Sequence, residues 1–406
     1  MHMSNTVVMK FGGTSLSLPE RRTVAADRVC ERVGEGKRIV VVVSAMGRRG
    51  APYATDTLLD LVRDFPHAGA REIDALAACG EEISAAIFAS VLNERGVKAI
   101  SLRGFQAGIV TDGLHREASI LEIRPRRMLS LLDQGTVVVV AGFQGTTLDG
   151  DVTTLGRGGS DTTAMSIAAA LRAEVVEIYT DVDGVLTADP KVVADARAVP
   201  EVTYEESAEL AFNGAEVLHP VAAERAQASG LSVKISNLLP GTDSTWIVPD
   251  EGRWSPGKEK APRTTAVTSA AGIAQLRISG ARFHSDPDLV ARIFAMVAER
   301  GVSLDMMNIS SDRVAFTLDR MHAQEIAAVL SEFGLEVEIT DRCAKVTLVG
   351  GGIHGIPGVM SRILRALARR RIGVHQSVDS NMIIGVLVDG ACEEEAVRAV
   401  HEEFFG

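Results

Sequence analysis

A short stretch near the N-terminus combines the residue types that handle phosphate. Apolar residues 7–9 predict a buried strand that ends at Lys10, and Gly12 and Gly13 follow, with two hydroxyl residues after them. Glycines let main-chain N–H groups approach an anion closely, and a helix that begins there adds its positive end. The stretch matches neither a P-loop nor a Gly-x-Gly-x-x-Gly loop. It indicates an anion-binding strand end, against the plainer interpretation of a lysine beside a tight turn.

A second glycine-rich stretch, 156–161, holds Arg157, Ser160 and Asp161 at the expected start of a helix. The arginine offers a two-pronged donor for a carboxylate, and the aspartate could order a lysine such as Lys10. The plainer interpretation is a glycine turn with an ordinary helix cap. Three further expected strand ends carry Gly, Ser, Thr or Asp residues, and these are 44–47, 142–145 and 180–184.

The elements that must position these residues alternate between strand-like and helix-like patterns over residues 5–250. Strands are expected at 6–10, 38–44, 98–102, 136–143, 175–180 and 232–236, and amphipathic helices at 19–33, 70–93 and 162–172. The strands are nearly continuous Val/Ile runs, which is typical of parallel strands covered on both faces. The pattern predicts an α/β sandwich with a mostly parallel sheet, whose ligands bind at the carboxyl ends of strands.

The C-terminal part of the chain repeats itself at an offset of 70 residues, since Gly280 matches Gly350 and Pro287 matches Pro357. Each copy predicts a ferredoxin-like βαββαβ unit, whose first strand is expected at 273–278 in one copy and at 344–349 in the other. A stretch rich in Pro, Gly and charge precedes the repeat and predicts a linker. The expected domains are 1–246 (the α/β domain), 247–263 (linker), 264–340 (first unit) and 341–406 (second unit).

Composition narrows the class of protein. The net charge of −11 argues against non-specific binding to nucleic acid or to an anionic membrane. No apolar run approaches the roughly 20 residues of a membrane helix, and no signal peptide is evident. The 4 cysteines are widely spaced without a zinc pattern, which favours reduced thiols in a cytoplasmic protein.

With these residues in place, the chain resembles the aspartate kinases of the amino acid kinase family over nearly its whole length, and its two C-terminal repeats resemble ACT domains. The motifs that carry the resemblance are Lys10-Phe11-Gly12-Gly13-Thr14-Ser15, Ser44-Ala45-Met46-Gly47, Gly80-Glu81, Gly142-Phe143-Gln144-Gly145, Gly156-Arg157-Gly158-Gly159-Ser160-Asp161, Thr180-Asp181-Val182-Asp183-Gly184, Ala188-Asp189-Pro190 and Leu218-His219-Pro220. The resemblance implies transfer of the γ-phosphoryl group of ATP to the β-carboxylate of L-aspartate, with Mg²⁺ bridging the phosphates.

The resemblance also implies roles for single residues. Lys10 would neutralise the transferring phosphoryl group, and Asp161 would position Lys10 and the substrate amine. The implied aspartate-binding residues are Thr55, Glu81, Arg157, Gly158, Gly159 and Ser160. The implied nucleotide-binding residues are Lys10, Phe11, Gly12, Gly13, Thr180, Asp181, Leu186, Asp189, Lys191, Glu216 and Val217. No protein residue is implied as a metal ligand.

Four positions depart from the family pattern, all in the implied ATP region. Glu216 and Val221 stand where the family usually has Lys and Arg, Leu186 replaces a common aromatic, and Lys191 replaces a common Arg. Two unit charges about 4 Å apart interact by about 4 kcal/mol at an effective dielectric constant of about 20. The charge reversal at Glu216 therefore predicts weaker or differently arranged ATP binding.

Three alternatives compete with a housekeeping aspartate kinase. The first is a kinase-inactive amino-acid sensor, which the change at Glu216 favours and the intact Lys10, Arg157 and Asp161 oppose. The second is a kinase of the same fold acting on glutamate, acetylglutamate, carbamate or UMP. The third is an aspartate kinase of a secondary pathway. For the ACT units the resemblance implies edge-to-edge pairing in at least a homodimer, with lysine, threonine, diaminopimelate or no effector bound between subunits. It also implies that the first unit is inserted into the second, so that 264–269 adds a strand to the second unit, and that 1–246 is the catalytic domain.

Overall fold

The structure is a computed structural model that describes residues 5–215, 218–239, 241, 243–249, 263–279, 283, 286–332, 334–353 and 356–406. Glu216, Val217 and most of the expected linker lie outside the described residues. The chain forms two compact units. The first unit is Met1–Val185, Ala198–Ala211 and Glu216–Arg253, and the second unit is Leu186–Arg197, Phe212–Ala215 and Trp254–Gly406.

An eight-stranded sheet in the order β10-β12-β11-β9-β1-β2-β6-β3 organises the first unit. Six of its strands run parallel, and β12 and β10 run the other way at one edge. The strands are β1 (Thr6–Phe11), β2 (Arg38–Val43), β3 (Ala99–Leu102), β6 (Val137–Ala141), β9 (Val175–Thr180), β10 (Glu201–Thr203), β11 (Val233–Asn237) and β12 (Ser244–Val248). The prediction of an α/β fold with a mostly parallel sheet is confirmed.

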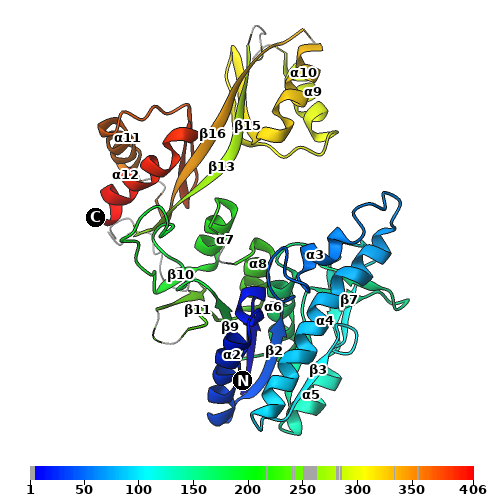
Figure 1. Ribbon diagram of the computed structural model, residues 1–406. Helices are drawn as coiled ribbons and strands as arrows, with labels where there is room; N and C mark the ends of the chain where they lie inside the picture. The colour runs from blue at the N-terminus through cyan, green and yellow to red at the C-terminus, as the bar shows by residue number, and fades with distance from the viewer. Residues whose placement is uncertain are drawn as a thin grey trace. The chain divides into compact units, whose positions relative to one another are not determined.

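Helices cover both faces of this sheet (Figure 1). Met9, Val41 and Val139 pack with Ala26 of α2 and Phe88 of α4 in one buried core, and α6 packs on β1, β2 and β9. The helices of this part of the chain are α1 (Gly13–Leu16), α2 (Pro19–Gly34), α3 (Thr55–Asp60), α4 (Ala70–Glu94), α5 (Arg126–Asp133), α6 (Gly159–Leu171), α7 (Tyr204–Phe212) and α8 (Pro220–Ser229).

Helix α4 is long and apolar enough to cross a membrane by length and composition alone. Half of its apolar window is buried inside the protein, where it packs on β3, β6 and β8. Two of its acidic residues, Asp74 and Glu81, are also buried. These contacts are those of a core helix.

A small four-stranded sheet in the order β5-β4-β7-β8 was not expected from the sequence. Its strands are β4 (Ile109–Thr111), β5 (Ile120–Ile123), β7 (Gln144–Thr146) and β8 (Val152–Thr154). Each has three or four residues, too few to produce a period-2 pattern. The sheet matters for the site because β8 leads directly into the glycine-rich stretch 156–161.

The second unit is built on an antiparallel six-stranded sheet in the order β14-β15-β13-β16-β18-β17. The strands are β13 (Arg263–Ser279), β14 (Asp305–Ile309), β15 (Arg313–Asp319), β16 (Glu336–Gly351), β17 (Gln376–Asp379) and β18 (Ile383–Asp389). The helices are α9 (Pro287–Ala298), α10 (Ala323–Glu332), α11 (Val359–Arg369) and α12 (Glu393–Phe405), with short 3₁₀ turns at Arg320–His322 and Gly390–Cys392. Among its described residues, one large hydrophobic core forms under α9 and α10 and another under α11 and α12, beside a small cluster of Met306, Cys343 and Leu387.

Two strands of this sheet are much longer than the sequence predicted. The expected strands 273–278 and 344–349 are parts of β13 and β16, which pair with each other along both cores. The pairing passes through a register shift between Ala270 and Ile273. A bulge of this kind turns the strand without ending it, so a break in the apolar pattern looked like a strand boundary.

Two short segments from the middle of the chain are built into the second unit. In the segment 186–197, Thr187 accepts a hydrogen bond from Val267 N at 2.8 Å, and its hydroxyl lies 2.9 Å from His401 Nε2 on α12. In the segment 212–215, Asn213 accepts hydrogen bonds from Thr268 and Thr347 at 2.8 and 3.2 Å. These segments are therefore part of the hydrogen-bonded framework around β13 and β16.

Candidate active site

Lys10 lies at the carboxyl end of β1, in the middle of the parallel sheet. It stands in register with Val42 of β2 and Ile178 of β9. Its Nζ lies 2.7 Å from Asp161 Oδ1 in the first turn of α6, and the two side chains are only 13% and 16% exposed. A partly buried pair of this kind fixes the ammonium group in one place. The central strand and the helix behind the second glycine stretch thus meet at this pair.

The loop after β1 holds its backbone against two neighbouring loops. Gly12 N donates to Tyr179 O at 3.3 Å, and Gly47 N donates to Gly13 O at 3.0 Å. A Cβ on Gly13 would stand 2.4 Å from Ala45 O, whereas a Cβ on Gly12 would meet nothing closer than 3.9 Å. Gly13 is therefore required for close approach between the two loops, while Gly12 leaves open space beside Lys10.

Glu81 is a buried carboxyl group on α4, with 3% of the residue exposed. Its Oε1 accepts a hydrogen bond from Ala45 N at 3.1 Å, and the Thr55 side chain is a further partner. Burial raises the pKa of Glu81 to about 8. Its Oε2 has no hydrogen-bond partner among the described residues. A buried acceptor of this kind suits a cationic ligand, because an ammonium group would satisfy Oε2 and stabilise the charged form.

The glycine-rich stretch before α6 needs its glycines for geometry. Gly156 and Gly158 have φ values of +73° and +69°, in the left-handed region. A Cβ on Gly158 would stand 2.2 Å from His219 Cγ, and one on Gly142 would stand 2.9 Å from Ser160 Oγ. In the part of the chain that the structure describes, the exposed Arg157 makes no ion pair or hydrogen bond. Its guanidinium group is therefore available to a ligand.

The residues implied as nucleotide contacts fall into three groups. Phe11, Thr180 and Asp181 lie at the ends of β1 and β9 with Lys10, and Asp181 forms an ion pair with Arg48 at 3.1 Å. Leu186, Asp189 and Lys191 belong to the second unit, where Asp189 Oδ1 accepts a hydrogen bond from Lys191 N at 2.8 Å. Glu216 and Val217 lie outside the described residues.

Sequence reasoning assigned no role to three residues beside the site. Arg48 follows β2 and reaches Asp181 at the end of β9. His219 lies against Gly158, and Asp74 is fully buried on α4. His219 stands in the motif Leu218-His219-Pro220 that carries the resemblance, although no role was assigned to it. Asp74 also left a signal in the sequence: an acid seven residues before Glu81 lies on the same face of a helix whose other residues there are mostly small.

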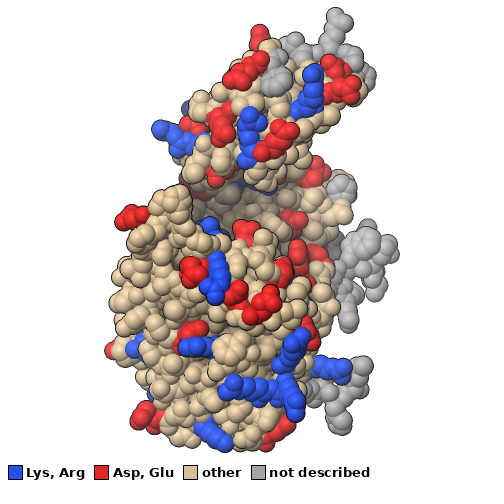
Figure 2. Space-filling view, turned by 90° about the vertical axis from the view of Figure 1, so that its right-hand side faces the viewer, with Lys and Arg blue, Asp and Glu red and all other residues tan. Residues whose placement is uncertain are grey.

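The charged side chains on the face drawn in Figure 2 are mixed, with acidic and basic groups interspersed. An anionic ligand that binds on this face would therefore depend on single cations and not on a broad basic surface.

Comparison with known protein families identifies the class of protein to which this fold and this site belong. Residues 5–237 match the model of the amino acid kinase family, and residues 346–404 match that of the ACT domain. The chain therefore belongs to the amino acid kinase family.

The full-length relatives are more specific. Aspartokinase 1 of Bacillus subtilis (strain 168) is 40% identical over 400 residues, covering 98% of both chains. An aspartokinase of Thermus thermophilus is 37% identical over 410 residues, covering 98% of both chains. The crystal structure of E. coli aspartokinase III in complex with aspartate and ADP superposes with a TM-score of 0.80 at 26% identity, covering 99% of this chain and 100% of that one. The resemblance to aspartate kinases is confirmed.

Proposed function

We propose that this chain transfers the γ-phosphoryl group of ATP to the β-carboxylate of L-aspartate, giving ADP and 4-phospho-L-aspartate. This is the first step of the aspartate pathway to lysine, threonine and methionine. One observation carries the proposal: Lys10 is held by Asp161 beside the open Gly12 backbone, at the carboxyl end of the central strand. Full-length relatives that are aspartokinases support it.

Phosphoryl transfer to a carboxylate requires the protein mainly to position the two substrates and to neutralise negative charge. The attacking β-carboxylate is already ionised at neutral pH, so no general base is needed. Lys10 neutralises negative charge on the phosphoryl group as it transfers, and Asp161 keeps Lys10 in position. The backbone N–H groups of Gly12 and Gly13 contribute donors to the phosphates. Holding both substrates at one sheet edge supplies the remainder of the rate enhancement.

The aspartate pocket is assigned to residues on α3 and α4 and at the start of α6. Arg157 binds the α-carboxylate through two N–H groups, and Glu81 with Thr55 binds the ammonium group. Gly158, Gly159 and Ser160 form the backbone wall at the start of α6.

Magnesium fits the site as a partner of ATP. Mg²⁺ keeps much of its hydration shell and is usually held by phosphates and one or two carboxylates, so it does not require a complete set of protein ligands. Asp161 and Asp181, both at the carboxyl edge of the sheet, are the carboxylates that would hold it. When bound, it would neutralise charge on the β- and γ-phosphates.

Nucleotide binding is assigned to Thr180, Asp181, Leu186, Asp189, Lys191, Glu216 and Val217, in addition to the Lys10 loop. Replacing Glu216 with lysine is expected to lower the KM for ATP by about tenfold, because it exchanges repulsion of the phosphates for attraction. Steady-state kinetics at saturating aspartate measure this. Glu224→Lys, the same charge change on an exposed position of α8, is the matched control. An unchanged KM for ATP in Glu216→Lys would refute the assignment.

The pH dependence of aspartate use follows from the raised pKa of Glu81. Below about pH 8 the free enzyme holds Glu81 protonated, and a neutral carboxyl group binds an ammonium group poorly. We expect kcat/KM for aspartate to rise as pH increases toward about 8 and then to level off, while the KM for ATP shows no such step. Glu81→Gln should abolish the step. A step that persists in this variant would assign it to another group.

Regulation and assembly are assigned by relationship. A structure of E. coli aspartokinase III contains lysine and aspartate and matches this chain with a TM-score of 0.78. We assign an amino-acid effector (lysine, threonine or diaminopimelate) to the C-terminal units, at least a homodimer to the assembly, and 1–246, 247–263, 264–340 and 341–406 to the catalytic domain, linker and two ACT units. All 4 cysteines are free, which suits the cytoplasm.

The deciding experiment is release of ADP from Mg-ATP with L-aspartate, with hydroxylamine present to trap the acyl phosphate. L-Glutamate serves as the control substrate, and lysine and threonine are then added in turn. Turnover with aspartate alone establishes the reaction. No turnover, with aspartate or lysine still raising the melting temperature, would favour an amino-acid sensor.

A further inference from the structure

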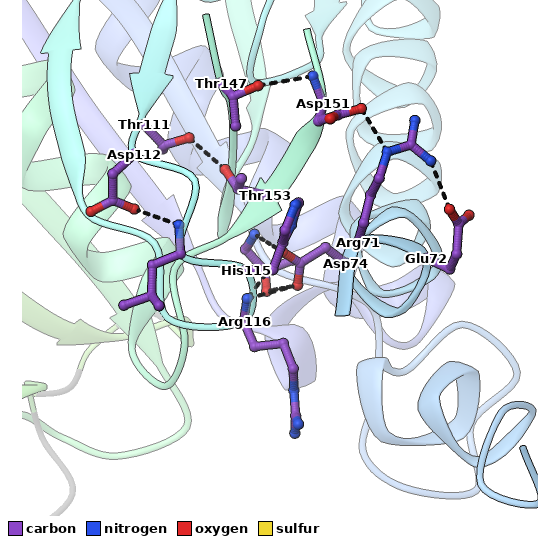
Figure 3. A network of polar contacts seen from close by, with 12 residues as sticks. Arg71, Glu72, Asp74, Thr111, Asp112, His115, Arg116, Thr147, Asp151 and Thr153 are labelled. Atoms are coloured by element: carbon purple, nitrogen blue, oxygen red, sulfur yellow. Dashed lines mark hydrogen bonds and ion pairs between the residues drawn. The ribbon is translucent and has the colours of Figure 1, made fainter. Parts of the chain in front are cut away.

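Asp74 is a fully buried carboxylate on α4, outside the set of residues assigned to either substrate. Figure 3 shows it between α4, the loop after β4 and the strand β8. A buried carboxylate is costly unless its oxygens are satisfied, so its hydrogen bonds indicate what it holds together.

Both oxygens of Asp74 are occupied by donors from two separate segments. On one side, Arg116 N donates at 3.0 Å and His115 Nδ1 donates at 2.8 Å, both to Oδ2. On the other side, Thr154 N donates to Oδ2 at 3.1 Å and the Thr154 hydroxyl donates to Oδ1 at 2.6 Å. Hydrogen bonds to a charged acceptor are the stronger ones, so this carboxylate clamps the two segments to α4 and to each other.

Thr154, which Asp74 holds through two hydrogen bonds, lies three residues before Arg157 in the sequence. Ala118 N donates to Thr154 O at 2.9 Å, and Leu155 N donates to Phe143 O at 3.0 Å. A Cβ on Gly156 would stand 3.3 Å from Arg116 O, which is tight contact with the segment that Asp74 also holds. The backbone just before Arg157 is therefore held by Asp74 at Thr154, together with the hydrogen bonds to Ala118 and Phe143.

The same face of α4 also makes hydrogen bonds to segments on the other side of the proposed aspartate pocket. Gln144 Nε2 donates to Ala78 O at 3.0 Å, and Glu81 accepts from Ala45 N at 3.1 Å. Residues 74, 78 and 81 are spaced by four and three, so they lie on one helix face. One rigid helix thus sets the distance between Glu81 and the segment that bears Arg157.

We propose that Asp74 is a positioning residue for aspartate binding, which places Arg157 relative to Glu81 without touching the substrate. The inference rests on the proposed function, in which Arg157 binds the α-carboxylate and Glu81 the ammonium group. Because a bidentate pair depends steeply on geometry, release of the clamp affects aspartate far more than ATP.

The competing interpretation is that Asp74 only stabilises the fold. In that case its loss would lower the melting temperature and leave the KM for aspartate unchanged in the folded fraction, or would raise the KM for both substrates equally. The two interpretations therefore differ in the ratio of the two KM values and not in stability alone.

The test compares Asp74→Asn with Asp112→Asn in the full chain. Asp112 also accepts hydrogen bonds from backbone groups of the same loop, Leu114 N and Ser119 N at 3.1 and 3.2 Å, but makes no bond to Thr154. We expect Asp74→Asn to raise the KM for aspartate by about ten- to a hundredfold, because it removes the negative charge that strengthens these hydrogen bonds and replaces one accepting oxygen with an NH2 group that cannot accept from Arg116 N. The KM for ATP should stay within about twofold of the wild-type value, and Asp112→Asn should change neither.

Thr154→Val gives a second, milder test, because it removes one donor to Asp74 and preserves side-chain shape. It should raise the KM for aspartate in the same direction by about three- to tenfold. If Asp74→Asn does not fold, this variant decides. Calorimetric Kd values for aspartate are measured beside turnover. A wild-type chain that neither binds nor phosphorylates aspartate would overturn the proposed function. Wild-type turnover with an unchanged aspartate KM in Asp74→Asn or Thr154→Val would overturn this inference alone.

Discussion

Replacement of Lys10 by methionine is expected to lower kcat by about a thousandfold or more. Lys10 stands at the end of the central strand and pairs with Asp161 at 2.7 Å, so its charge is delivered to one defined point. Methionine preserves length and apolar packing but removes the charge that balances the transferring phosphoryl group. Single-turnover measurement of phosphoryl transfer separates this loss from any change in binding.

Lys37→Met is the control for this experiment. Lys37 lies just before β2 and pairs with Glu174 at 2.6 Å, so the substitution also breaks a lysine–carboxylate pair in the first unit. It lies at the opposite end of the parallel strands from Lys10. Its kcat should remain within about twofold of the wild-type value. A loss in Lys10→Met no larger than in Lys37→Met would exclude Lys10 from the chemistry.

Replacement of Gly13 by alanine is expected to damage both folding and activity. The new Cβ would stand 2.4 Å from Ala45 O and 2.9 Å from Gly47 O, and both obstacles are backbone atoms that cannot swing away. Relief requires the loops after β1 and β2 to separate. We expect the melting temperature to fall by about 5 °C or more and kcat by about a hundredfold.

Gly12→Ala distinguishes this steric cause from a general intolerance of the loop. A Cβ there would meet only Lys10 Nζ and Tyr179 O, both at 3.9 Å, which is ordinary contact. Thermal unfolding of Gly12→Ala should therefore match the wild type to within about 2 °C. Equal destabilisation by the two substitutions would show that the loop packing does not explain the requirement at Gly13.

The sequence was most informative where one physical pattern dominated. The Val/Ile runs of β2 and β9 predicted parallel central strands because burial on both faces leaves no alternation. The small sheet around β8 was not predictable from strands of three or four residues. The extent of β16 was also hidden, because polar residues around Arg342, which has φ of +56°, interrupt its apolar pattern in mid-strand.

In the site, sequence motifs indicated which types of residue take part. The tertiary structure determines which groups these residues contact. Lys10 and Asp161 could be expected at one sheet edge because each ends or begins an element there. The hydrogen bond from Ala45 N to Glu81 and the clamp at Asp74 join segments far apart in the chain, so no local pattern encodes them. The same holds for Leu186 and Asp189, which follow β9 in sequence yet belong to the compact unit around β13.

The embedding of residues 186–197 has a consequence for how this protein can be divided. Ala188 and Val193 are buried in the hydrophobic core under α11 and α12, and Thr187 is hydrogen-bonded to β13. A fragment that stops before residue 247 would expose these side chains to water and leave their backbone groups unpaired. We therefore expect such a fragment to be less stable than the full chain, and a gene fusion or domain swap keeps this core intact only if it carries residues 186–197 together with their C-terminal partners.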